Sequence, residues 1–222
     1  MRDGARVDVR AFFLDRTPRT VASVESYFDI DRLRVGTDFE LQRGRFVVRD
    51  EVSVRAPHGD GNTRARDEDP ATQINATEAD QICAREGGRL PSEDEWEHAA
   101  RNGRGTVWRY PWGDETEREG RSLANTWDGV FPNANTLRDG HLFASPVGSF
   151  PPTPLGFRDL VGNVWQWTST PGEGGTRVIR GGSYLCDPDV CHGFRVDARQ
   201  FANPSERFAH IGFRCAFDLR QR

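Results

Sequence analysis

Features that define several common protein classes are missing from this sequence. No stretch approaches the roughly 20 apolar residues that a membrane-spanning helix requires. The opening residues, MRDGARVDVRAFFLD, contain no apolar run of signal-peptide length. These absences predict a cytoplasmic protein that has no membrane partner.

The sequence also lacks a long run of residues that carry charge of one sign. The 222 residues include 30 Lys and Arg and 34 Asp and Glu, which gives a formal net charge of −4. Because no basic stripe is present, nucleic acid is not an expected partner. The chain has neither a Walker loop nor a G-x-S-x-G elbow, so the usual signals of nucleotide hydrolysis and acyl transfer are missing.

The composition nevertheless indicates a folded chain. Mean hydropathy is low at −0.71, yet aromatic residues reach 10% and Gly (23) and Pro (13) are plentiful. Disordered chains lack aromatic residues, so this mixture favours a loop-rich fold with a core of aromatic rings. The length suits one domain with a sizeable core, although two small domains remain possible on length alone.

Cysteine is scarce, with four residues in the whole chain. In a reducing compartment, such cysteines are expected to be thiols or metal ligands more often than disulfides. They do not fall into two close pairs, which argues against a four-cysteine zinc site.

The N-terminal third predicts short elements joined by loops. Residues 7–15 favour a strand, and Thr20 is positioned to cap a short helix. Residues 29–55 are charged and β-prone, with a hairpin expected around Gly44. Residues 56–72 are polar and rich in turn formers, which predicts a surface loop.

Two helices are predicted with more definite ends. Asn75 is a candidate cap for the first helix, and Gly87 ends it. Ser92 and Glu95 form a capping-box pattern at the start of the second. The acidic side chains of SEDEWE on that second helix are expected to stabilise it and to face solvent.

The second half of the chain predicts short strands separated by long, turn-rich connections. Such connections need support beyond regular hydrogen-bond ladders, and bound ions are one solution. The strands are expected at 164–167, 176–184 and 211–217.

Six motifs follow one another in an order that is similar to a known superfamily. They are RLPSEDEWEHAAR (89–101), YPWGDE (110–115), ANTWDGVFP (124–132), PVGSFPPTPLGFRDLVGNVWQWTS (146–169), RVIRGGSYLC (177–186) and GFRCAF (212–217). Together they resemble the formylglycine-generating enzyme, or sulfatase-modifying factor, superfamily over roughly residues 75–218. The resemblance implies an α+β fold, a C-type-lectin-like variant with little regular secondary structure. It implies a single domain over 1–222 whose N-terminal part, 1–72, is shortened.

The resemblance also implies an activity. Catalytic members of this superfamily use dioxygen as co-substrate to convert a cysteine of a peptide or protein client, such as a sulfatase, to formylglycine. They hold copper between two cysteines, which correspond here to Cys186 and Cys191 in GGSYLCDPDVC. From the residues alone, a C-x4-C pair after a Gly-Gly turn is able to place two soft sulfur donors on one cavity, which suits Cu(I). Two unremarkable thiols or a labile disulfide are the alternatives.

Further roles follow only from the resemblance. Ser183 matches a residue that lines the family's oxygen pocket, and Trp165 or Trp167 matches its aromatic wall. A turn hydroxyl and ordinary core packing are the alternatives. Cys83 and Cys215 occupy positions that form disulfides in some relatives. Their expected partner positions hold Ala100 and Val196, so both bridges are expected to be absent.

Two structural Ca²⁺ sites are implied in the same way. The first uses Asn125, the carbonyl of Thr126, Asp139 and the carbonyl of His141; the second uses Asp159, the carbonyls of Gly162 and Val164, and Gln166. Calcium prefers several hard oxygen ligands, many from the backbone. Ordinary Asx turns are the alternative.

Several departures from the family pattern leave the client open. The T-x-A-E stretch that helps grip the arginine of a CxPxR client is not found. Val190 replaces an aromatic residue, Asp187 replaces a basic or polar one, and His210 replaces Asn. His192 and His210 are candidate metal ligands or acid–base groups, or simply hydrogen-bonding residues.

Three functions compete on this sequence. The favoured one is a copper-dependent oxidase that forms formylglycine or oxidises a related thiol. The alternative is a non-catalytic, lectin-like module that binds a protein or small ligand. An iron oxygenase akin to the sulfoxide synthases is disfavoured because no HxxxHxE stretch occurs.

Overall fold

Short elements and long irregular connections make up the computed structural model, which describes residues 7–41, 43–59, 63–103, 105, 107–188 and 191–219. None of the helices in these ranges has the length and apolar character needed to cross a bilayer. The helices are α1 (Val21–Val24), α2 (Ala76–Arg85) and α3 (Glu93–Ala100). The strands are β1 (Phe12–Leu14), β2 (Arg34–Glu40), β3 (Arg45–Val52), β4 (Glu117–Arg118), β5 (Arg121–Ser122), β6 (Gly129–Val130), β7 (Ala134–Asn135), β8 (Trp165–Pro171), β9 (Arg177–Arg180), β10 (Gln200–Ala202), β11 (Ile211–Gly212) and β12 (Ala216–Asp218).

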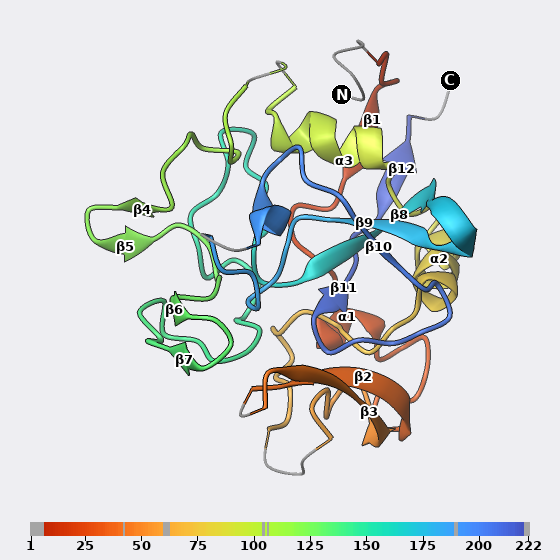
Figure 1. The fold of residues 1–222 in the computed structure, drawn as a ribbon. Coiled ribbons are helices and arrows are strands. Elements are labelled where there is room, and N and C mark those ends of the chain that lie inside the picture. The colour runs from red at the N-terminus through yellow and green to blue at the C-terminus, as the bar shows by residue number, and fades with distance from the viewer. Residues whose placement is uncertain are drawn as a thin grey trace.

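A sheet of order β10-β9-β8-β11 occupies the middle of the molecule (Figure 1). Strand β8 pairs antiparallel with β9 and parallel with β11. Its first four residues are buried on both faces, and α2 and α3 pack against it. The main core lies between these helices and the sheet and includes Trp96, Trp167 and Phe213. An α+β architecture with little regular secondary structure, as the sequence predicts, is therefore what the chain adopts.

The helices begin where their caps predict. The Asn75 side chain accepts a hydrogen bond from the Glu78 backbone N–H, and the Glu78 carboxylate accepts one from the Asn75 N–H. Ser92 and Glu95 form the same reciprocal pair at the start of α3. Each capping box satisfies two backbone donors that the helix itself leaves unpaired. Thr20 caps α1, also as predicted.

The acidic side chains of α3, however, do not face solvent as predicted. Glu93, Glu95 and Glu97 are buried. The guanidinium of Arg180 donates to Glu97 at 2.7 Å, and that of Arg89 donates to both oxygens of Glu95 at 2.7 and 2.6 Å. Arg180 is itself buried, and a buried charge needs an opposite charge beside it. The helix therefore turns its acids inward.

Cys83 and Cys215 also contradict the sequence analysis, which expected neither to be bridged. They form a disulfide, with their Cα atoms 5.5 Å apart and a separation of 132 positions in the sequence. Cys83 lies on the buried face of α2, and Cys215 directly precedes β12. Each cysteine is the partner of the other, so the residues at Ala100 and Val196 have no bearing on this bridge.

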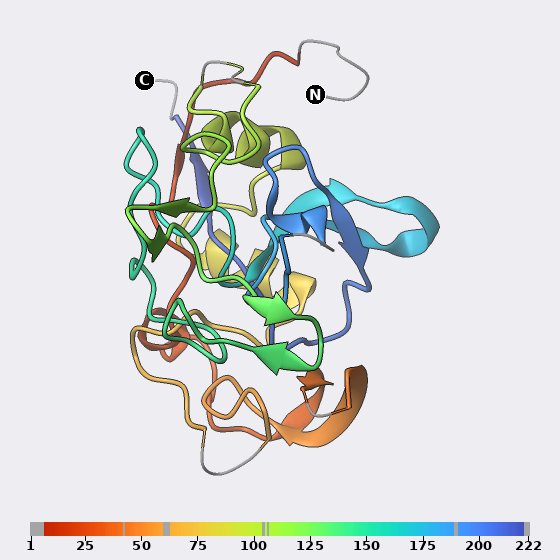
Figure 2. The ribbon, with the colours of Figure 1, turned by 60° about the vertical axis from the view of Figure 1, so that its left-hand side comes forward.

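Strand β12 also pairs antiparallel with β1, which joins the two ends of the described chain (Figure 2). Both strands are shorter than predicted. The segment 211–217 is not one strand but two, because it divides into β11 and β12 and leaves the residues between them outside either ladder. Residues 176–184 likewise contribute only the four residues of β9.

A β2–β3 hairpin with Gly44 in its turn confirms the prediction for this region. The prediction that the polar segment 56–72 is a surface loop is wrong for part of its length, because Pro57, His58 and residues 69–72 are buried. His58 enters the interior because its Nδ1 lies 2.9 Å from the carboxylate of Asp38, a buried residue of β2. The hairpin contributes Thr37 and Phe46 to the wall of the cleft described next.

Candidate active site

The two remaining cysteines are placed by a glycine turn after β9. Gly181 and Gly182 have φ values of +99° and +72°, in the left-handed region that favours glycine. A Cβ on Gly182 would also lie 2.6 Å from the Cβ of Phe194, so no side chain fits there. The turn returns the chain toward the sheet and directs it through Ser183 to Cys186.

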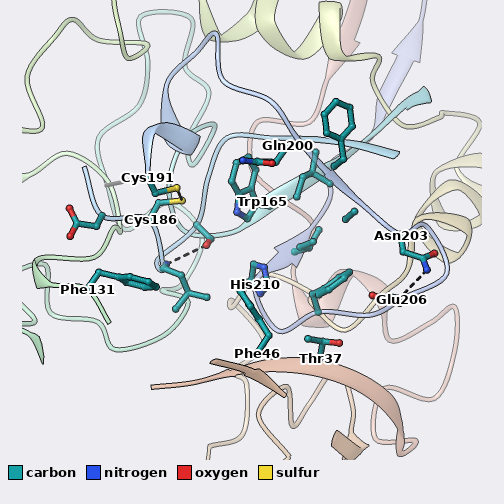
Figure 3. A pocket seen from close by; sticks show the side chains of 18 residues that line it. Thr37, Phe46, Phe131, Trp165, Cys186, Cys191, Gln200, Asn203, Glu206 and His210 are labelled. Carbon is teal, nitrogen blue, oxygen red and sulfur yellow. Dashed lines mark hydrogen bonds between the residues drawn. The ribbon is translucent and has the colours of Figure 1, made fainter. Parts of the chain in front are cut away.

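The sulfurs of Cys186 and Cys191 lie side by side, 2.9 Å apart, and the cysteines are free thiols (Figure 3). The backbone N–H of Cys191 donates to the carbonyl of Asp187 at 2.8 Å, which holds Cys191 close to Cys186. Cys186 is buried and Cys191 is half-buried. The pair therefore offers two sulfur donors at one point, and one of them is accessible.

The environment separates the acidities of these two thiols. The hydrogen bond that the Cys186 thiol donates to Cys191 raises the pKa of Cys186 well above its ordinary value, and burial raises it further. The same hydrogen bond lowers the pKa of Cys191 to about 7, and the backbone N–H of Gly193 adds to this effect. Near neutral pH the pair therefore shares one proton, with the negative charge on Cys191.

The sulfurs lie at one end of a cleft of about 690 Å³. Its walls come from the β2–β3 hairpin, β10, the segment 203–211 and the cysteine turn, and they are mainly apolar (Figure 3). Asp187 and Glu206 are the acidic residues of the lining, and no lysine or arginine belongs to its described part. The cleft therefore suits an apolar, neutral or cationic ligand, and it leads directly to the thiols.

The structure distinguishes the two tryptophans that the sequence left open. Trp165 lines the cleft beside the cysteines, with its ring against Gly193. Trp167 lies fully in the core and donates its indole N–H to the carbonyl of Ile74 at 3.0 Å. Ser183 also lines the cleft, and its hydroxyl oxygen accepts the backbone N–H of Leu185 at 3.3 Å.

His210 is the more informative of the two candidate histidines. Its ring lines the cleft between Phe46 and Phe208, at centroid distances of 5.3 and 5.6 Å. Its Nδ1 is buried with no hydrogen-bond partner, and burial lowers the pKa of the imidazole to about 4. His210 is therefore neutral at physiological pH. His192 is exposed and does not belong to the lining.

Several lining residues were not identified from the sequence. Apart from Phe131, which belongs to the motif ANTWDGVFP, they come from segments outside the six motifs, and no sequence signal placed any of them near the cysteines. They are Thr37, Phe46, Phe131, Gln200, Phe201, Asn203 and Glu206. Val190, singled out for replacing an aromatic residue, lies outside the described residues.

The residues of the first predicted calcium site do come together. Asp139 accepts the backbone N–H groups of Thr126 at 3.3 Å and His141 at 2.9 Å, and burial raises the pKa of its carboxyl group. The side-chain oxygen of Asn125 is buried with no hydrogen-bond partner. A desolvated carboxylate that contacts Thr126, next in the chain to an unpaired amide oxygen, is compatible with a hard cation.

The second predicted calcium site fits less well. The amide oxygen of Gln166 accepts the indole N–H of Trp96 at 2.9 Å and the guanidinium of Arg214 at 2.7 Å, which uses both of its lone pairs. Arg214 also donates to the carbonyl of Asp159 at 2.8 Å. A buried guanidinium is therefore the cation that contacts these two residues, and Gln166 has no acceptor left for a metal. The carbonyls of Gly162 and Val164 remain predicted ligands.

Comparison with known proteins decides the family. The Sulfatase-modifying factor enzyme 1-like domain matches residues 2–219. The chain belongs to this sulfatase-modifying factor family. This confirms the assignment that the six motifs suggested, together with the C-type-lectin-like fold that it implies.

The chain is similar both to relatives that are named as enzymes and to relatives that are named as inactive. It is 40% identical over 182 residues to the formylglycine-generating enzyme of Streptomyces coelicolor, covering 74% of this chain and 58% of that protein. It is 39% identical over 170 residues to the inactive C-alpha-formylglycine-generating enzyme 2 of Bos taurus, covering 73% and 55%. The chain thus spans less than two thirds of these curated relatives.

Among solved structures, PvdO from Pseudomonas aeruginosa is similar to the chain. The TM-score is 0.68 at 25% identity, covering 94% of this chain and 80% of PvdO. The shared fold therefore extends beyond the motif-bearing region into the N-terminal third of the chain.

Proposed function

We propose that this protein is a copper-dependent oxidase that uses dioxygen to convert a cysteine side chain of a peptide or protein client to formylglycine. The observation that carries the proposal is the pair of free sulfurs, 2.9 Å apart, at the end of an apolar cleft. Relatives named formylglycine-generating enzyme support an oxidoreductase of this family.

The donor set suits copper in its reduced state. Thiolates are soft ligands that favour Cu(I), and the lowered pKa of Cys191 makes one thiolate available near neutral pH. When bound, copper would supply the one-electron chemistry by which dioxygen is activated. Cys186 and Cys191 would hold it, beside the Trp165 ring and Ser183 in the lining of the cleft.

The overall reaction balances with a thiol reductant. The client's C–S bond and one Cβ–H bond are broken, a C=O bond forms, and the sulfur leaves as sulfide. Dioxygen accepts four electrons, two from the client carbon and two from the reductant. One of its oxygen atoms enters the aldehyde and the other leaves as water.

The cleft also limits the client. Its aromatic and aliphatic walls suit an extended peptide that carries a cysteine, and its only described charged side chains are acidic. Neutral and basic residues beside the client cysteine are therefore favoured, and acidic ones are disfavoured by charge repulsion. A sulfatase is a client of this kind that the family suggests.

We also propose a structural Ca²⁺ at Asn125, Thr126, Asp139 and His141. The buried, unpaired amide oxygen of Asn125 supports it. Such an ion would neutralise the carboxylate of Asp139 and tie together two segments that have no regular secondary structure around it.

A non-catalytic binding module is the second candidate. It is favoured by the similarity to a relative named inactive, since the fold alone does not decide activity. This candidate predicts that loss of either sulfur leaves the ligand-binding properties of the cleft unchanged.

Oxygen uptake tests the proposal. The full chain, loaded with Cu(I) and supplied with a thiol reductant, is expected to consume dioxygen when given cysteine peptides with neutral or basic flanking residues. Mass spectrometry should detect an aldehyde in place of the thiol. A peptide with serine in place of cysteine, and the Cys191→Ala protein, serve as controls. No uptake above these controls with any peptide would favour the binding module.

A further inference from the structure

A second cavity, separate from the cysteine cleft, is rich in arginine. Its volume is about 630 Å³, and it shares no lining residue with the cleft. Segments 118–123, 138–141 and 149–152, together with Arg158, form its walls. Its basic side chains are Arg118, Arg121, Arg138 and Arg158, and its acidic ones are Glu119 and Asp139.

Two of these arginines are paired across a tight hairpin. Arg118 of β4 lies directly opposite Arg121 of β5. Glu119 and Gly120 between them have φ values of +52° and +73°, the pattern of the two-residue type I′ turn. Directly opposed residues of a hairpin point to the same face, so both guanidinium groups are directed toward one side.

This arrangement is unfavourable without a negative partner. Like charges placed directly opposite each other destabilise a strand pair. Across the described chain, neither Arg118 nor Arg121 takes part in an ion pair, although Arg138 beside them pairs with Glu117 and Asp128. The hairpin also carries Glu117, which pairs with Arg138, and Glu119 in its turn, so Arg118 and Arg121 are exposed arginines of the cavity lining that lack an ion pair of their own among the described residues.

A third arginine is held rigidly in the same cavity. Arg158 donates from one terminal nitrogen to the carbonyls of Gly148 at 3.0 Å and Phe150 at 2.7 Å. These two hydrogen bonds hold the guanidinium group in place, and its other N–H groups have no acceptor among the described residues. The lining also contains the carboxyl groups of Glu119 and Asp139, so its four arginines outnumber its acids by two.

We propose that this cavity binds a tetrahedral oxyanion, phosphate or sulfate, either as the free ion or as a monoester on a larger molecule. Arg118 and Arg121 contact the anion from the hairpin, and Arg158 contacts it from the cavity wall. Guanidinium groups form paired, charge-assisted hydrogen bonds with such oxygens, which is the chemistry that a converging set of arginines provides.

Calorimetric titration of the full chain with sodium phosphate, and separately with sodium sulfate, tests this site. Sodium chloride at equal ionic strength is the reference. We expect saturable binding of at least one of the two anions that Arg118→Gln/Arg121→Gln weakens by at least about tenfold. The matched control, Arg32→Gln/Arg43→Gln, removes the same charge from exposed positions outside the cavity and should change the affinity less than about twofold.

Two results of these titrations would contradict the proposal. Titration heats with both phosphate and sulfate that match chloride would overturn the proposal, as would equal losses of affinity in the two double variants. Thermal unfolding checks that the hairpin variant remains folded. Cys186→Ala should retain anion binding, which keeps this test independent of the oxidase.

A phosphoserine peptide distinguishes the two sources of the anion. Displacement of inorganic phosphate by the peptide at lower concentration than by free phosphate identifies a monoester on a macromolecule as the ligand. Displacement only at higher concentration identifies the free ion. In both cases the loss of binding in Arg118→Gln/Arg121→Gln must be the same, or the site is wrongly placed.

Discussion

The two thiols of the cleft have different acidities. Cys186 is buried and acts as the donor, whereas Cys191 accepts its hydrogen bond and is half-buried. This asymmetry follows from the hydrogen bond between the two sulfurs and from the deeper burial of Cys186. It makes Cys191 the reactive sulfur of the metal-free protein.

Alkylation by iodoacetamide tests this asymmetry. Because the pKa of Cys191 is lowered to about 7, its reaction rate should rise with pH around a midpoint near that value. Cys186→Ala removes the donated hydrogen bond, so the midpoint should move to higher pH. Cys186→Ser supplies a hydroxyl donor and should restore much of the shift. Peptide mapping identifies the modified residue. An unchanged midpoint in Cys186→Ala would show that the two sulfurs do not interact.

Gly193 holds the cysteine pair against the aromatic wall. A Cβ at this position would lie 2.6 Å from the Trp165 ring and 3.0 Å from the sulfur of Cys191, both too close for ordinary contact. Gly193→Ala is therefore expected to displace one of them and to weaken Cu(I) binding by at least about tenfold. Competition with a Cu(I) chelator measures the affinity. Ala198→Ser, on the same connection, is the control, and equal affinities of the two variants would contradict this role.

Among the elements, those with strong local signals were the ones predicted correctly. The capping boxes at Asn75 and Ser92 involve residues three positions apart, so the sequence alone contains both partners. The direction of the acids on α3 depends on arginines far along the chain, and Arg180 is 83 positions from Glu97. No local pattern reports such a partner, and the prediction that these acids face solvent was therefore wrong.

The start of α3 should be measurably stabilised by its cap. Ser92→Ala removes the acceptor for the Glu95 N–H and is expected to lower the free energy of unfolding by about 1 kcal/mol. Urea denaturation measures the change. Ser92→Asn keeps an oxygen in the capping position and should cost much less. A loss of equal size in both variants would mean that the cap contributes nothing specific.

The whole molecule is held together by contacts between distant segments, and these were the least predictable part. The ordered motifs identified the family and hence the fold, but the residues of the cleft come from β2, β3, β10 and irregular loops that carry no shared pattern. The bridge between Cys83 and Cys215 was missed for the same reason. Two of the four cysteines are therefore bridged, contrary to the thiols expected in a reducing compartment, and the cytoplasmic location is still a prediction.

The disulfide is expected to stabilise the whole fold. It closes a loop across 132 positions, which restricts the unfolded chain strongly. Cys83→Ala/Cys215→Ala should lower the free energy of unfolding by about 2–5 kcal/mol, measured by denaturation in urea. Copper binding should remain, because neither residue lines the cleft. A double variant as stable as the natural chain would show that the bridge does not form in solution.

Anaerobic titration of the reduced protein with Cu(I) tests the central claim most directly, that the sulfurs of Cys186 and Cys191 form one metal-binding pair. The expected result is one tightly bound copper ion per chain, lost in Cys186→Ala and in Cys191→Ala and retained in Cys83→Ala/Cys215→Ala. Absence of stoichiometric binding, or binding that survives the loss of either sulfur of the pair, would contradict the account.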